Sequence, residues 1–433
     1  MSSTLQVIRQ RVARILGIYE SGTSSSAGAA AGASAICNTI RNRKDDFYNG
    51  WFLKVPSLSA PNSQEVEDFE AASGTFFPET AFSAQVDSGV AIELYRYDPD
   101  LIDQAIQETI RGNFPSFNQW FVNDHLISGD WLRNGNFEEW TASTVPDSWS
   151  KTASLTCAKE TSTKWYGANA LKTTNTAATQ WLSQSETELP ELLDLRGKSV
   201  TFRVWCKTAT ASHARLVIQT TDDGGTTTTT YSGFHTGSDR REILYIESCN
   251  IPDDVRNIQF QLSCAVNAIV AYWDQARVTG KTKREYYLPS NTQIITEVFR
   301  QVSGDTEDNT DPCDDLGLDQ TFYPVNAWEV VETGTRKLRI PGALSEGYKI
   351  RLKGLTLCTV PTTDTGTTEI DSPALDYLIP LTCLWLIKNL GGSTAATDRS
   401  YLTSRRAEFE AEALRQRQHR HLFPPIQVRT GKV

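Results

Sequence analysis

Nine short segments between residues 129 and 280 constrain most strongly what this chain can fold into. They are rich in Thr, Val and aromatic side chains, and turn signals such as Asp222-Asp223-Gly224-Gly225 separate them. Many short strands at such spacing are typical of a β-sandwich or barrel. The expected strands are 155–159, 170–173, 179–185, 199–207, 214–220, 226–233, 241–246, 258–263 and 269–278.

The sequence on both sides of this insert favours a mixture of strands and helices. Residues 1–128 predict a helix at 4–19, a Gly/Ala/Ser-rich linker at 21–35, strands at 51–55, 66–69, 74–77 and 90–97, and a helix that begins after Asp98. Residues 281–421 predict strands at 285–288, 294–302, 328–331, 337–340 and 348–357, an exposed acidic loop at 305–319, and helices at 373–390 and 397–420.

Each flank is too poor in strands to cover a sheet by itself. We therefore expect residues 1–128 and 281–421 to form one discontinuous α+β core domain, with 129–280 as an inserted β-sandwich and 422–433 as an extended basic tail. The predicted fold class is mainly β with α. A chain of 433 residues is also too long for one ordinary core.

Composition and charge exclude several classes of function. The net charge of −10 argues against a general nucleic-acid binder. The chain has no apolar run long enough for a membrane span, and the N-terminus does not resemble a signal peptide, which favours synthesis in the cytoplasm. The eight cysteines are expected to be buried free thiols, because their spacing does not fit zinc. No catalytic motif stands out, so we expect no enzyme activity.

Motifs at both ends of the insert resemble those of carbohydrate-binding modules. One end carries Asn134-Gly135-Asn136-Phe137-Glu138, and the other carries Tyr272-Trp273-Asp274. Between them, Pro146-Asp147-Ser148-Trp149 and Trp181-Leu182-Ser183-Gln184 add to the resemblance. It covers about a third of the chain. It implies a jelly-roll sandwich and a glycan as a partner.

The same resemblance implies a structural calcium ion near the ends of the insert. Calcium prefers several oxygen ligands from carboxylates, amides and carbonyls. Asn136, Glu138 and Asp274 can supply them if the terminal strands are neighbours. The alternative is that these side chains serve as turn and capping residues. No other cofactor is expected.

Aromatic side chains are the usual platforms on which such modules stack sugar rings. Trp149, Trp165 and Tyr231 lie in or near predicted loops and are the predicted carbohydrate contacts. Trp181 and Trp205 lie within predicted strands, so we expect them in the core. Because one scaffold serves many tasks, the sandwich could instead only decorate an assembly.

The flanks resemble structural proteins of tailed bacteriophages. The resemblance rests on Asp45-Asp46-Phe47-Tyr48-Asn49-Gly50-Trp51, the segment 89–97 with its following helix, and two C-terminal helices. The arrangement is similar to head-to-tail connector (adaptor or neck) proteins. It implies a virion protein, made in the host cytoplasm, that forms a ring, commonly twelvefold. Its implied partners are the portal, a tail or nozzle protein and packaged DNA that passes non-specifically through the channel.

The C-terminal end of the chain is basic, and the resemblance implies that it docks on the portal. No acid follows Glu412. A basic, proline-bearing end folds poorly by itself and suits insertion into an acidic groove. The alternatives are a solvated tail and a DNA contact. The predicted docking residues are Arg415, Arg417, Arg420, Pro424, Pro425, Arg429 and Lys432.

Two other functions stay open on the sequence. A tail-tip, baseplate or fibre protein could use the sandwich to bind host glycan. A non-viral carbohydrate-binding protein of a cell envelope could carry the same module. The N-terminus, which does not resemble a secretion signal, argues against the second.

Overall fold

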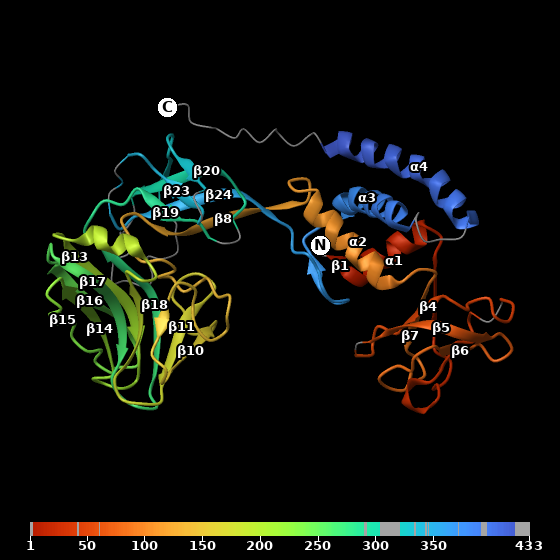
Figure 1. Ribbon diagram of the computed structural model, residues 1–433, viewed down its shortest axis with the longest axis horizontal. Helices are drawn as coiled ribbons and strands as arrows, with labels where there is room; N and C mark the ends of the chain where they lie inside the picture. The colour runs from red at the N-terminus through yellow and green to blue at the C-terminus, as the bar shows by residue number, and fades with distance from the viewer. Residues whose placement is uncertain are drawn as a thin grey trace. The chain divides into compact units, whose positions relative to one another are not determined.

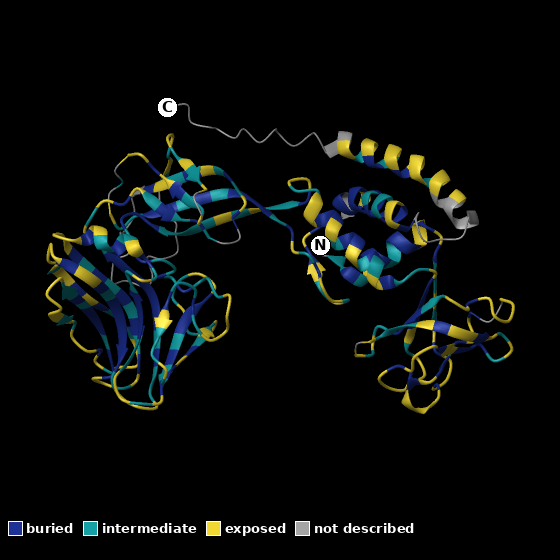
Figure 2. Ribbon diagram, in the orientation of Figure 1, coloured by how far each residue is buried: buried dark blue, intermediate teal, exposed yellow. Residues whose placement is uncertain are grey.

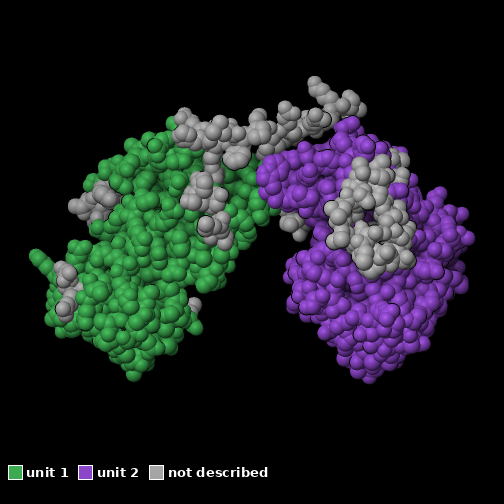
Figure 3. Space-filling model, turned by 180° about the vertical axis from the view of Figure 1, so that it is seen from behind, with its two compact units in different colours: residues 1–119, 355–426 green, residues 120–354, 427–433 purple. Residues whose placement is uncertain are grey.

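The computed structural model describes two compact units, which Figure 3 colours separately. Among the described residues, unit 1 lies within 1–119 and 355–426, and unit 2 lies within 120–354. Residues 281–354, expected with the flanks, therefore cluster with the sandwich. The structure describes residues 3–40, 43–59, 61–289, 292–303, 321–332, 335–342, 344, 346–370, 372–390 and 396–420.

Most of unit 2 is a β-sandwich of two five-stranded sheets (Figure 1). The strand orders are β10-β11-β18-β13-β16 and β15-β14-β17-β12-β9. All the expected strands of the insert are present, and the predicted fold class is confirmed: the chain is mainly β with α and carries a jelly-roll sandwich. The strands are β9 Ser150–Lys151, β10 Leu155–Glu160, β11 Ala170–Asn175, β12 Gln180–Ser185, β13 Ser199–Lys207, β14 Ala214–Asp222, β15 Thr227–Tyr231, β16 Arg241–Asn250, β17 Val255–Cys264 and β18 Val270–Thr279.

The strands of the sandwich alternate between core and surface (Figure 2). In β13, the side chains of Val200, Phe202, Val204 and Cys206 are buried, and those between them are not. This period of two is what a sheet with one covered face requires. The two sheets share one hydrophobic core, in which Trp273 is fully buried.

Two smaller sheets complete unit 2. One has the strand order β21-β20-β24-β8, and the other has the order β19-β23-β22. They share a core around Ile295, Leu338 and Ile350, so residues 281–354 have buried apolar surface independent of the helices. The sequence did not predict β8 or β21. The strands are β8 Asn118–Ile127, β19 Glu285–Tyr287, β20 Ile294–Ser303, β21 Thr321–Pro324, β22 Glu329–Val331, β23 Lys337–Arg339 and β24 Lys349–Leu357.

Four helices form the larger core of unit 1. The Thr4 hydroxyl accepts the backbone N–H of Val7 and caps α1, and the Asp98 carboxylate accepts that of Asp100 and caps α2. The apolar helix α3 packs against the other three. In the described part of the chain, none of the helices combines the length and apolar character needed to cross a bilayer. The helices are α1 Leu5–Ile15, α2 Pro99–Gly112, α3 Ser372–Leu390 and α4 Ala396–Arg420.

A six-stranded sheet with the order β2-β7-β4-β5-β6-β3 forms the second core of unit 1. The prediction of a linker at 21–35 is wrong, because part of β2 and a short helical turn at Ala30–Gly32 lie in this segment. Gly32 has a φ of 73°, and a Cβ there would lie 2.5 Å from the carbonyl oxygen of Phe82. The strands are β2 Tyr19–Thr23, β3 Ala35–Ile36, β4 Phe52–Lys54, β5 Ser63–Glu70, β6 Thr75–Pro78 and β7 Ala91–Tyr95; β1 Ser3–Thr4 pairs with β25 Thr367–Thr368.

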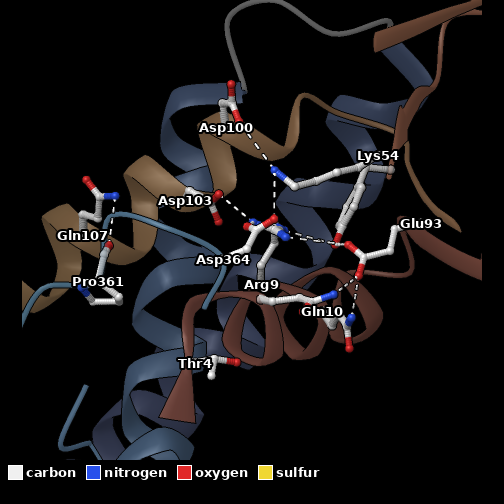
Figure 4. A network of polar contacts seen from close by, with 12 residues as sticks. Thr4, Arg9, Gln10, Lys54, Glu93, Asp100, Asp103, Gln107, Pro361 and Asp364 are labelled. Carbon is white, nitrogen blue, oxygen red and sulfur yellow. Dashed lines mark hydrogen bonds and ion pairs between the residues drawn. The ribbon is translucent and has the colours of Figure 1, made fainter. Parts of the chain in front are cut away.

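A buried polar network joins segments from both ends of the chain within unit 1 (Figure 4). The Arg9 side chain is fully buried, and its Nη1 lies 2.6 Å from Asp103 Oδ2 and 2.7 Å from Asp364 Oδ1. Its Nε donates to the Tyr95 hydroxyl at 3.1 Å. Lys54 Nζ lies 3.6 Å from the Asp364 carboxylate. Because a buried charge is costly without partners, this network fixes the segment around Asp364 against α1.

Candidate ligand-binding site of the sandwich

The three predicted carbohydrate contacts lie in different environments. Trp149 is 5% exposed, packs on Phe137 with ring centroids 5.3 Å apart, and donates its indole N–H to the carbonyl oxygen of Asn134 at 3.1 Å. It belongs to the core, so the prediction of Trp149 as a sugar platform is wrong. Trp165 is half-buried in a turn. Tyr231 is 51% exposed at the end of β15, where its ring is accessible to a ligand.

Trp181 and Trp205 do not lie in the core, contrary to the expectation. Strand residues alternate between faces, and their buried neighbours, among them Leu182 and Val204, take the inward positions. Trp181 therefore lies on the outer face of the sheet β15-β14-β17-β12-β9, and Trp205 lies on the outer face of the other sheet. In β13 the apolar residues Val200, Phe202, Val204 and Cys206 occupy the opposite parity to Trp205, which was a usable signal in the sequence.

The outer face that carries Trp181 includes a group of uncharged polar side chains, and Arg215 and Val217 of β14 lie on the same face. The strand register aligns Ser183 of β12 with Gln261 of β17, and it aligns Gln259 of β17 with Gln219 of β14 in the next row. We call Ser183, Gln219, Gln259 and Gln261 the glutamine face. Ser183 and Gln261 are only 3% and 6% exposed, so neighbouring side chains hold them in place.

Hydrogen bonds connect the members of the glutamine face. Gln259 Nε2 donates to Ser183 Oγ at 2.7 Å, and Gln261 Nε2 donates to Gln259 Oε1 at 2.8 Å and to Gln219 Oε1 at 3.4 Å. Each amide has two donor hydrogens and an oxygen with two lone pairs. Gln261 uses both of its amide hydrogens in these bonds, so the groups left for a ligand belong to the half-buried side chains of Gln219 and Gln259.

Aromatic rings lie at both ends of the glutamine face. Trp181 is on β12 and Tyr231 is on β15, three strand spacings or about 14 Å apart. The guanidinium of Arg215 stacks on Tyr231 at 3.9 Å and on Phe234 at 4.6 Å, which restrains both exposed rings. Amides between flat rings can exchange hydrogen bonds with hydroxyl groups while the rings cover an apolar ligand surface.

Two of the three predicted calcium ligands meet at one turn. Asp274 Oδ2 accepts the backbone N–H of Trp165 at 3.0 Å, and Glu138 Oε1 accepts that of Ala168 at 2.7 Å. Both carboxylates thus cap the turn, which is the alternative that the sequence left open. Asn136 is half-buried in the loop before Glu138 and lines a cavity of unit 2.

One oxygen of Asp274 has no hydrogen-bond partner in the described part of the chain. The side chain is fully buried, and Oδ1 is the unsatisfied atom. Burial raises the pKa of this carboxyl to about 7, and the nearby charge of Glu138 acts in the same direction. A buried oxygen of this kind beside a second carboxylate suits Ca²⁺. The described residues contain no cluster of three or more His, Cys, Asp or Glu suited to a metal, so carbonyls or water would complete the coordination.

The predicted portal-docking residues are only partly described. Arg415 and Arg417 are exposed on α4, and Arg415 forms an ion pair with Glu412 at 2.8 Å. Arg420 is the last residue of α4. The remaining predicted docking residues lie outside the described residues: Pro424, Pro425, Arg429 and Lys432. The predicted acidic loop at 305–319 also lies outside them.

Comparison with known proteins gives matches among solved structures. No family model matches the sequence, and no curated protein matches it. The chain is similar to the C-terminal family 22 carbohydrate-binding module of Clostridium thermocellum Xyn10B, with 18% identity, 35% of this chain and 93% of that chain covered, and a TM-score of 0.29.

Two further solved structures are similar to this chain. TmCBM61 in complex with β-1,4-galactotriose has 15% identity, covers 35% of this chain and 99% of its own, and has a TM-score of 0.26. The enzymatically active domain of tailspike protein 4 of bacteriophage CBA120 has 11% identity, covers 35% of this chain and 22% of its own, and has a TM-score of 0.26. The strand order of the two five-stranded sheets establishes the sandwich independently of these matches.

Proposed function

We propose that the sandwich binds a neutral glycan chain across the glutamine face. The observation that carries the proposal is the hydrogen-bonded row of amides between the rings of Trp181 and Tyr231. Amides and hydroxyls offer hydrogen bonds without a net charge, which suits uncharged sugars. The restrained ring of Tyr231 loses little conformational freedom when a ligand stacks on it.

Substitution of Trp181 tests this proposal against a matched control. Trp181→Ala removes a ring beside the glutamine face, and Trp205→Ala removes a ring from the outer face of the other sheet, where it stacks on Arg241 at 4.2 Å. The wild-type chain is screened on a glycan array, and the best ligand is then titrated calorimetrically. Loss of one stacking contact of about 1 kcal/mol should weaken binding roughly fivefold in Trp181→Ala. An array without binding, or equal losses in both variants, contradicts the proposal.

We further propose that the whole chain is a non-enzymatic structural protein of a tailed-phage virion, in which unit 1 forms the ring of a head-to-tail connector. Support comes from the network around Arg9 and Asp364, which joins residues 1–119 to the segment after residue 354 within unit 1. These two segments carry the resemblance to connector proteins. A scaffold built from both ends of a chain tolerates a large insertion such as unit 2. The net charge of −10 disfavours retention of DNA in a channel.

Native mass spectrometry with and without a portal protein tests the connector proposal. We expect a closed ring, and a variant that ends at Arg420 should lose binding to the portal because it lacks the basic tail. Trp181→Ala should keep portal binding, since the glutamine face is a separate site. A chain that stays monomeric with the portal present contradicts the proposal.

Antibody labelling of purified virions separates the connector role from its alternatives. Label at the neck supports the connector, and label at the tail tip or a fibre supports a glycan-binding tail protein. Absence from virions contradicts both and favours a carbohydrate-binding protein of non-viral origin.

A further inference from the structure

Unit 2 contains a cavity that is distinct from the glutamine face. It has a volume of about 400 Å³ and lies against the loop that follows Leu132. Its lining includes His125 from β8, Gln275 from β18 and Tyr287 from β19. The volume falls within the range of small-molecule sites, which also form preferentially where two substructures meet.

An irregularity in β18 turns side chains toward this cavity. The register of β13 with β18 shifts between the pairs Arg203–Arg277 and Trp205–Asp274, so that two residues of β18 oppose one residue of β13. Gln275, one of those two, has a φ of 53°. Bulges of this kind redirect side chains and are frequent beside functional sites.

Gly135 allows the backbone of the loop to approach the bulge closely. Its carbonyl oxygen accepts the backbone N–H of Ala276 at 2.8 Å, and a Cβ at position 135 would lie 1.9 Å from the Ala276 carbonyl oxygen. Only glycine allows so close an approach of the two backbones. The loop that carries Arg133 is therefore held in a fixed position relative to Gln275.

Among the described residues, the side chains of Gln275 and Arg133 in the lining each have a hydrogen-bond donor without a partner. Gln275 is 8% exposed, and its Nε2 is unsatisfied, as is the Nε of Arg133. The guanidinium of Arg133 stacks on the ring of Tyr287 at 4.7 Å and forms no ion pair with an acid among the described residues. Unsatisfied buried donors are costly, so a ligand that brings acceptor oxygens would be stabilised here.

Asp130, Glu138, Glu139 and Asp147 line the cavity, and three of these acids, Asp130, Glu138 and Asp147, accept hydrogen bonds from the protein. Asp130 Oδ1 accepts the backbone N–H of Leu132 at 3.0 Å. Asp147 accepts the backbone N–H and the hydroxyl of Thr141 at 2.8 and 2.9 Å. These hydrogen bonds hold the loop in place, and Arg133, Arg277 and Lys283 contribute positive charge to the same lining.

We propose that this cavity binds an acidic sugar of the hexuronate class. The guanidinium of Arg133 forms a forked pair of hydrogen bonds with the ligand carboxylate, the arrangement in which arginine is most effective. Gln275 donates its amide hydrogen to an oxygen of the sugar ring or of a hydroxyl group. The cavity thus recognises a charged ligand, whereas the glutamine face suits a neutral chain.

Titration of the full-length chain with sodium glucuronate tests the proposal. Binding is followed by ligand-detected NMR and calorimetry, and glucose and acetate serve as the neutral-sugar and bare-carboxylate references. Arg133→Gln should weaken glucuronate binding about tenfold or more, because it removes a charged hydrogen bond. Gln275→Leu should weaken it also. Arg241→Gln, another arginine that stacks on an aromatic ring, should leave the affinity unchanged.

The other possible results of the titration overturn the proposal, provided that the variants are folded. Circular dichroism confirms that the variants are folded, as expected because the contact of the Arg133 side chain within the described residues is its stacking on the Tyr287 ring. No binding of glucuronate at millimolar concentration, or unchanged affinity in Arg133→Gln, overturns the proposal. Acetate that binds as well as glucuronate overturns the sugar class. Loss of glucuronate binding in Tyr231→Ala assigns the ligand to the glutamine face and overturns the assignment to the cavity.

Discussion

Replacement of Asp274 by Asn should stabilise the calcium-free protein at neutral and higher pH. Burial raises the pKa of Asp274 from 3.8 to about 7, so the folded chain holds this proton more tightly than the unfolded chain. The stabilisation that the neutral carboxyl provides is complete below about pH 4 and is lost as the pH rises through 7. The difference between the two pKa values corresponds to about 4 kcal/mol of unfolding free energy, an upper limit for the gain.

The geometry of the turn explains why Asn fits this position. Its amide oxygen can accept the backbone N–H groups of Trp165 and Tyr166, as Asp274 Oδ2 does. Its NH₂ group takes the place of the unsatisfied Oδ1 and adds a donor near the carboxylate of Glu138. The substitution therefore removes a buried charge without removing the hydrogen bonds.

Calcium should make the wild type more stable than the Asn variant. A cation that binds the charged form of Asp274 stabilises the folded wild type by mass action, and the effect grows with calcium concentration. The Asn variant lacks that charge, so its unfolding temperature should respond little to calcium. The difference in unfolding temperature between the Asn variant and the wild type should therefore have opposite signs with and without calcium.

Thermal unfolding followed by circular dichroism between pH 4 and 8, in EDTA and in calcium chloride, measures both effects. In EDTA at pH 8 the variant should unfold at a higher temperature, by up to about 10 °C. An Asn variant that is less stable than the wild type in EDTA at pH 8 would refute the reasoning about burial. An equal response of both proteins to calcium would refute the assignment of the metal to Asp274.

Three further substitutions have defined outcomes. Arg9→Ala leaves the carboxylate of Asp364 without its closest cation and should lower the unfolding free energy by about 3–5 kcal/mol in urea titration, whereas a loss below 1 kcal/mol would contradict a structural role. Trp149→Ala should cost about 3–5 kcal/mol as a core truncation but leave the glycan affinity of the folded protein unchanged, as calorimetry can check. Gly135→Ala forces a Cβ against the carbonyl oxygen of Ala276 and should cost about 1–3 kcal/mol, and a neutral effect would show that the loop can move.

Local patterns in the sequence were sufficient for most of the elements. The caps at Thr4 and Asp98 marked the starts of two helices, and alternation marked the strands of the sandwich. These features depend on neighbours within a few residues, where backbone and side-chain chemistry act directly. The strand β8 was missed because polar residues such as Asn123 and Asp124 interrupt its apolar pattern.

The sites depend on contacts that no local pattern specifies. Trp149 lies near a turn, yet loop packing puts it in the core, and Trp181 lies in a strand, yet its parity puts it outside. The glutamine face exists only because three strands from distant parts of the sequence align in one register.

The sequence by itself therefore determined the fold class, the strands of the sandwich and the two capped helices. Only the tertiary structure decided which aromatic rings are exposed, that Arg9 meets Asp364, and that Gln275 and Arg133 line one cavity. The physical reason is that burial and side-chain partners are set by packing between segments far apart in the chain.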